Sequence, residues 1–157
     1  MIVIHTEALG IRRQLLSVVI NFFKDFVNST TFITKPDPQD IPKTIEERIK
    51  YEPVADEDFT KAMQPLSHEQ LSNILKHEAA WKAVIASKTP TLIIEDDAFI
   101  LPESAEALKN MPQELPQGIA FLGITQPNIP PTSPQTFHQS NFKIIPNKEA
   151  YIVTPDI

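Results

Sequence analysis

The sequence contains no cysteine and only three glycines among its 157 residues. Without cysteine, the chain has no disulfide framework, no thiolate metal site and no thiol nucleophile. None of the three glycines belongs to a Walker phosphate loop with its Gly-Lys-Ser/Thr ending, and no serine lies in a Gly-x-Ser-x-Gly elbow. Any catalysis by this chain must therefore use other groups.

Long apolar runs and an excess of positive charge are lacking as well. No stretch approaches the roughly 20 apolar residues of a transmembrane helix. The N-terminal stretch "MIVIHTEALG" has no basic leader and no small-residue cleavage site. The formal net charge of -6 argues against a surface that binds the phosphate backbone of nucleic acid. We therefore expect a cytoplasmic protein with no membrane span and no nucleic-acid partner.

Proline, in contrast, is abundant, with 15 residues. The prolines cluster in residues 35–43 and 125–135, which we interpret as loops because proline lacks a backbone donor and restricts the residue before it. Neither loop is long enough to separate independent domains. The length and the 41% hydrophobic content fit one core, so residues 1–157 are predicted to form a single domain.

Between these loops, strand-like and helix-like patterns alternate. The strands are expected at residues 1–5, 31–34, 91–95, 118–123, 142–145 and 150–154, the last two as a pair. The helices are expected at residues 11–27, 44–50, 67–88 and 102–111. This order predicts an α/β fold with a largely parallel sheet, in which ligands bind beyond the carboxyl ends of the strands.

Two of these helices have clear sequence signals. Ser67 and Gln70 form the pattern of a capping box at the start of the longer helix. Apolar residues then recur at helical spacing at Leu71, Ile74, Trp81 and Ile85. In the first helix the corresponding stripe is Ile11, Leu15, Val18, Phe22 and Phe26. We also expect Trp81 to be a core residue.

The stretch "TLIIEDDAFI" places three acids, Glu95, Asp96 and Asp97, at the end of a predicted buried strand. Strand alternation would turn Glu95 and Asp97 to one side and Asp96 to the other. Two converging carboxylates repel each other, and a divalent cation such as Mg²⁺ or Mn²⁺ would offset this repulsion. The alternative, that these acids cap the next turn or pair with surface lysines, is the more common arrangement for a bare triplet.

The wider segment, residues 66–100, resembles the signature region of glycosyltransferase family 25. This family contains lipooligosaccharide galactosyltransferases and collagen galactosyltransferase-like domains. The matching residues are His77, Trp81 and the Glu95–Asp97 triplet, in the family's order. The stretches "IVIH", "IRRQLL", "IAFLG" and "AYIVT" are similar to other family segments more loosely, so that the resemblance covers most of the chain.

Two departures from the family pattern lie in the same helix. Lys76 replaces the serine that usually precedes the histidine, and Ser72 replaces a glycine. The chain also stops a few residues after "AYIVT", where the family continues into a segment that helps to form the acceptor side. We therefore expect the nucleotide-sugar half of the fold, without that acceptor-side segment.

The resemblance implies a GT-A type nucleotide-diphospho-sugar transferase fold, with a Rossmann-like, mostly parallel sheet flanked by helices. It also implies a divalent cation, Mn²⁺ or Mg²⁺, held by Glu95 and Asp97 and bridging the diphosphate of the donor. Asp96 would contact the sugar or the ribose of the donor. For His77, a role in the donor site and a core histidine bonded to a carbonyl group both remain open.

Two further donor-site candidates come from their place after the first strand. Thr6 could meet the nucleotide there, and Arg12 lies at the start of the following helix, where a diphosphate can approach. A solvent-exposed helix face would explain Arg12 or its neighbour Arg13 equally well.

The predicted function is metal-dependent transfer of a hexose, such as galactose or glucose, from a nucleoside diphosphate sugar to a hydroxyl group of a glycan or glycoprotein. The alternative is a non-catalytic, truncated domain that binds a nucleotide, a glycan or another protein. Retention of the acidic triplet favours the enzyme, because unpaired clustered acids destabilise a fold. The catalytic base is unknown, since a choice among Asp56, Glu57, Asp58 and Asp156 would be arbitrary.

Overall fold

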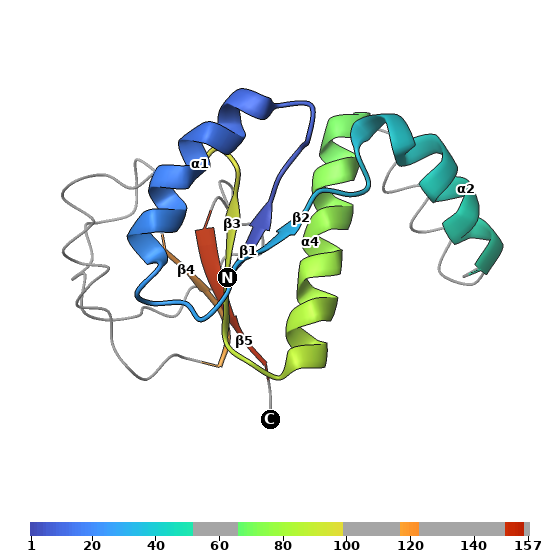
Figure 1. The fold of residues 1–157 in the computed structure, drawn as a ribbon. Coiled ribbons are helices and arrows are strands. Elements are labelled where there is room, and N and C mark those ends of the chain that lie inside the picture. Colours follow the sequence, from blue (N-terminus) through green and yellow to red (C-terminus); the bar gives the residue numbers. More distant parts are fainter. Residues whose placement is uncertain (52–65, 99–116, 123–149, 156–157) are drawn as a thin grey trace, which may run out of the picture.

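The computed structural model describes residues 1–51, 66–98, 117–122 and 150–155 (Figure 1). Its strands are β1 (Ile2–Ile4), β2 (Thr31–Ile33), β3 (Thr91–Glu95), β4 (Gly118–Phe121) and β5 (Ala150–Thr154). Its helices are α1 (Gly10–Phe23), the short 3-10 helix η1 (Pro38–Asp40), α2 (Ile41–Tyr51) and α4 (His68–Ser87). The predicted α/β class is confirmed.

The five strands form one mixed sheet in the order β2-β1-β3-β5-β4. β1 pairs in parallel with β2 and with β3, whereas β5 is antiparallel to both of its neighbours, β3 and β4. The sheet is thus less parallel than predicted. The strand predicted at 142–145, the helix predicted at 102–111 and the loop predicted at 125–135 lie outside the described residues.

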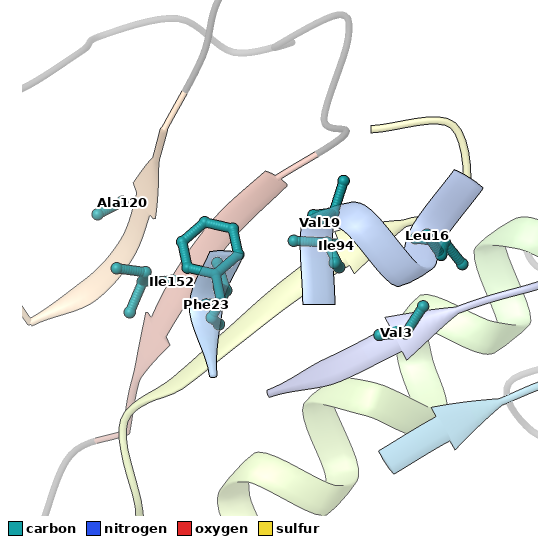
Figure 2. Packing of buried hydrophobic residues seen from close by; sticks show 8 residues of the cluster. Val3, Leu16, Val19, Phe23, Ile94, Ala120 and Ile152 are labelled. Carbon is teal, nitrogen blue, oxygen red and sulfur yellow. The ribbon is translucent and has the colours of Figure 1, made fainter. Parts of the chain in front are cut away.

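The two faces of the sheet are covered by α1 on one side and α4 on the other (Figure 1). Strand residues alternate between these faces, as the pleat requires. The cluster on the α1 face, shown in Figure 2, consists of Val3, Leu16, Val19, Phe23, Leu92, Ile94, Ala120 and Ile152. The cluster on the α4 face consists of Ile2, Ile4, Ala80, Val84, Ile93 and Tyr151.

In both long helices, the face that packs against the sheet differs from the face that the predicted apolar stripe selects. In α1, Leu15 and Val18 are 65% and 72% exposed, while the buried residues are Leu16, Val19 and Phe23. In α4, Leu71 of the predicted stripe is buried, but Ile74, Trp81 and Ile85 are exposed, and the other buried apolar residues are Leu75, Ala80 and Val84. Both helices carry apolar doublets such as Leu15-Leu16, so two stripes about 100° apart have the same period and only packing separates them.

The helix ends follow local capping rules. The capping box of Ser67 and Gln70 is confirmed, with both backbone N–H groups bonded to the partner's side chain. Residues 38–43, predicted as loop, instead form η1 and the start of α2. Pro38 and Pro42 fit there because first-turn N–H groups need no helical partner. In the described ranges of the chain, no helix is both long and apolar enough to cross a bilayer.

Leu16→Ala should lower the free energy of unfolding by about 3 kcal/mol, because Leu16 is 1% exposed and its truncation leaves a cavity. Leu15→Ala, the matched control one residue earlier, should change it by less than about 0.5 kcal/mol. Urea unfolding of both variants measures the difference. A larger loss for Leu15→Ala would show that α1 packs through the stripe predicted from sequence.

Candidate functional site

Three parallel strands end at the same edge of the sheet, the upper edge in Figure 1. β1 is followed by His5 and Thr6, β2 by residues 35–37, and β3 by Asp96 and Asp97. β3 is the central strand, so the predicted place of the acidic triplet, at the carboxyl end of a central strand, is confirmed. In an open α/β sheet this edge is where ligands usually bind.

Asp96 is the buried centre of this edge, at only 8% exposure. Its Oδ2 accepts hydrogen bonds from His5 Nδ1 at 2.9 Å and from the backbone N–H of Thr6 at 3.1 Å. Its Oδ1 accepts a bond from Arg12 at 2.8 Å. Burial alone would raise the pKa of Asp96, but the hydrogen bonds from Arg12, Thr6 and His5 outweigh it and hold the pKa below its usual range. Asp96 is therefore a charged anchor that joins β3 to the β1–α1 turn.

The charge of Asp96 also fixes the proton on His5. A carboxylate only accepts hydrogen bonds, so the His5 proton must lie on Nδ1, which faces Asp96. His5 Nε2 is buried, and the described residues offer it no hydrogen-bond partner. His5 therefore bonds to Asp96 through Nδ1, and its ring lies edge-on to the ring of Phe32, with 6.5 Å between the ring centroids.

Arg12 is a positively charged residue of this edge whose side chain is in contact with solvent. The same guanidinium nitrogen that bonds to Asp96 donates to Asp97 Oδ2 at 3.2 Å, and the Arg12 side chain is 43% exposed. The hydrogen bond to Asp96 raises the pKa of Arg12 further. Arg13 points elsewhere, with its guanidinium 5.3 Å from the centre of the Phe32 ring in β2. Of the two arginines, Arg12 is thus the one at the candidate site.

Glu95 faces α4. Its Oε1 lies 2.9 Å from His77 Nε2, and its Oε2 accepts a bond from Asn73 at 3.1 Å. The other nitrogen of His77 bonds to the hydroxyl group of Tyr151, which also accepts the indole N–H of Trp81 at 2.9 Å. Burial raises the pKa of Tyr151. His77 is therefore a buried histidine, as one of its two interpretations held, but its partners are a carboxylate and a hydroxyl group instead of a carbonyl group.

The directions predicted for the triplet are wrong. Glu95 lies on the α4 side, whereas Asp96 and Asp97 both contact Arg12, which belongs to α1. The reason is that strand pairing ends at Glu95 and residues 96–97 form a turn, so the alternation of a strand no longer applies. The expectation that Trp81 is a core residue is also wrong, since Trp81 is 38% exposed, although its N–H donates to Tyr151 and its ring lies beside that of His77.

The predicted metal ligands Glu95 and Asp97 are bonded on different sides of the edge, Glu95 to His77 and Asn73 of α4 and Asp97 to Arg12 of α1, and a cation shared by them stays a prediction. The described residues contain no cluster of three or more His, Cys, Asp or Glu side chains that could hold a metal ion unaided. Mg²⁺ commonly binds through one or two carboxylates together with substrate phosphates and water. Asp97, at 48% exposure, is the more accessible of the two acids, while Glu95 is 20% exposed.

The three acids have protein hydrogen-bond and ion-pair partners that the sequence does not indicate. Arg12 contacts Asp96 and Asp97, and two α4 side chains contact Glu95, so the triplet is not a set of unpaired charges. These contacts stabilise the three acids without a ligand, so the presence of the triplet does not by itself indicate a function.

Several residues of this edge were not predicted. They are His5, Asp37, Asn73, Lys76 and Tyr151. One local signal was available for Asp37, because Asp37 and Asp40 lie three residues apart beside Pro38 and form a capping box. The arbitrary candidates for the catalytic base, residues 56–58 and 156, lie outside the described residues.

Comparison with known proteins adds no relative. No model of a protein family matches the chain, and no curated protein matches it either. The resemblance to glycosyltransferase family 25 therefore rests on the residues quoted above and stays a prediction, as do the activity and the metal that it implies.

Asp96→Asn should destabilise the protein by about 2 kcal/mol at pH 7, because charge-assisted hydrogen bonds are weakened. The Asp96 pKa is lower in the folded than in the unfolded state, so this stabilisation is complete above the unfolded value of about 3.9 and is lost as the pH falls through the folded value. Urea unfolding of both proteins from pH 7 to pH 3 should show the difference shrinking below about pH 4. A difference that stays constant with pH would contradict the charged anchor, and Asp97→Asn, at an exposed acid, serves as the control with a smaller effect.

Proposed function

We propose that the chain is a GT-A type domain that binds a nucleoside diphosphate sugar at the carboxyl edge of β1 and β3 and transfers its hexose to a hydroxyl group of a glycan or glycoprotein. The observation that carries this proposal is the half-exposed Arg12 guanidinium, held at that edge by Asp96 and Asp97. An arginine fixed in this way presents donors in the fork geometry that suits phosphate oxygens. The cytoplasm, where nucleotide sugars would be available, is the proposed compartment.

The start of α1 supports the same ligand. α1 follows β1 directly, its N-cap residue is Leu9, and no side chain caps its first turn. Backbone N–H groups at such a helix start attract anions, and the helix dipole adds to the attraction. The diphosphate would therefore lie between the start of α1 and Arg12, with Thr6 beside it on the preceding turn.

Each acid has its own part in this proposal. Asp97 and Glu95 would hold Mn²⁺ or Mg²⁺ together with the diphosphate, and the cation, when bound, would neutralise charge on the leaving diphosphate. Asp96 keeps Arg12 and the Thr6 backbone in place. The two carboxylate oxygens of Asp96 already accept three hydrogen bonds from the protein. A direct contact between Asp96 and the donor stays a prediction.

The alternative function is a non-catalytic module that binds a nucleotide, a glycan or a partner protein. One observation favours it: the acidic triplet is balanced by protein donors, so the fold needs no cation for charge balance. The two functions differ in turnover and agree on where a nucleotide would bind.

Calorimetric titration with UDP-galactose and UDP-glucose, each with and without Mn²⁺, tests the donor site. We expect binding that requires Mn²⁺ and is at least about tenfold weaker in Asp97→Asn, which removes a charged ligand but keeps an oxygen for Arg12. Asp25→Asn, at an exposed acid just beyond α1, is the matched control and should bind as the wild type does.

Release of the nucleoside diphosphate in the presence of glycan acceptors then separates the two functions. Metal-dependent release supports the transferase, whereas binding without release supports the module. Unchanged metal-dependent binding by Asp97→Asn would refute the proposed metal ligand.

A further inference from the structure

Lys76, in the middle of α4, is a charged residue with a side chain that is only 1% exposed. An ammonium group has three N–H donors and no acceptor. Three acceptors surround the Lys76 Nζ: the carbonyl oxygen of His5 at 3.0 Å, the hydroxyl group of Thr6 at 3.1 Å and Asp37 Oδ1 at 3.4 Å. The donor capacity of the ammonium group is thus fully used within the described structure.

Two of these acceptors belong to the residues that Asp96 also holds. His5 accepts from Lys76 through its carbonyl oxygen and donates to Asp96 through its ring. Thr6 accepts from Lys76 through its hydroxyl group and donates to Asp96 through its backbone N–H. The turn after β1 is therefore fixed from one side by a buried cation and from the other by a buried anion.

The third acceptor ties the turn after β2 to the same ammonium group. Asp37 is 5% exposed, and its Oδ2 accepts a bond from Lys35 at 3.1 Å. The carbonyl oxygen of the neighbouring Pro36 accepts a bond from Ser72, one helical turn before Lys76. The two α4 residues that depart from the family pattern thus both bond to the loops at this edge.

Burial and the neighbouring charges have opposite effects on the ammonium group of Lys76. Burial lowers the pKa of Lys76, and the attraction of Asp37 and Asp96 for its ammonium group offsets this only in part, while Lys35 lowers the pKa further. A buried lysine is costly unless it is paired and hydrogen-bonded, and removal of one partner of such a pair leaves the other charge uncompensated. The contacts on three sides explain why this position tolerates a lysine.

We propose that Lys76 is a positioning residue of the donor site: its ammonium group holds the carbonyl group of His5 and the hydroxyl group of Thr6, so that Asp96 keeps Arg12 where it can bind a nucleoside diphosphate. This inference rests on the function proposed above for the ligand, but the positioning itself is a property of the chain. Lys76 does not touch the ligand, since all of its donors face the protein.

Two variants separate positioning from stability. Lys76→Met removes the ammonium group and leaves the buried Asp37 with Lys35 as its cationic partner, so a loss of stability is expected whether or not Lys76 positions the site. In the double variant Lys76→Met/Asp37→Asn the buried charge is gone as well, and stability should largely return. The matched control is Lys82→Met, on the same helix, whose side chain is 69% exposed and pairs with Glu78.

Two readouts are taken on the full chain. The amide ¹H–¹⁵N resonance of Thr6 reports its hydrogen bond to Asp96 without any ligand, and titration with UDP-galactose and Mn²⁺ reports the site. We expect the Thr6 resonance to shift and the dissociation constant to rise by about tenfold or more in both Lys76 variants, even where stability has returned, because small displacements of binding groups are costly. Lys82→Met should change neither.

The outcomes are distinct. If the double variant regains both the wild-type Thr6 resonance and wild-type affinity together with its stability, Lys76 contributes stability only and the inference is wrong. If the wild type binds no nucleotide sugar, the proposed function fails, and the Thr6 resonance alone decides the positioning: a shift in the double variant supports it and an unshifted resonance overturns it. If Lys76→Met does not fold, the double variant carries both readouts.

Discussion

The buried carboxylate of Asp96 is the interaction on which the candidate site depends. It joins the end of β3 to the turn after β1 and to the first turn of α1, through His5, Thr6 and Arg12. A buried charge is tolerated only where hydrogen bonds compensate for its lost hydration. Here that compensation fixes the geometry of the edge, so the same contacts that stabilise Asp96 also set the direction of Arg12.

A second layer of charge extends this arrangement to α4 and β2. Lys76 holds the same turn from the opposite side and reaches Asp37, while His77 and Asn73 hold Glu95. The sheet edge is therefore organised by hydrogen bonds between neighbouring loops and helices, with donors from α1, from α4 and from the turn after β1. One consequence is that Arg12, although its side chain is 43% exposed, is held in one direction by the buried Asp96 and contacts Asp97.

The same layout explains why the acidic triplet is ambiguous as evidence of function. Its three members have different tasks: Glu95 packs against α4, Asp96 anchors the fold, and Asp97 lies half-exposed beside Arg12. Protein donors balance the charge of all three acids without a ligand. Structural contacts therefore account for acids at these positions, and measurements on the individual residues show whether a ligand also uses them.

The sequence by itself determined the features that depend on neighbouring residues. These include the order of strands and helices, the capping box at Ser67 and the place of the acidic triplet at the end of a central strand. Only the tertiary structure decided which face of α1 and α4 is buried, since apolar doublets give both faces the same period. It also decided the partners of Asp96 and Lys76, because hydrogen bonds across 91 and 71 residues of chain have no local signal and exist only once the loops meet.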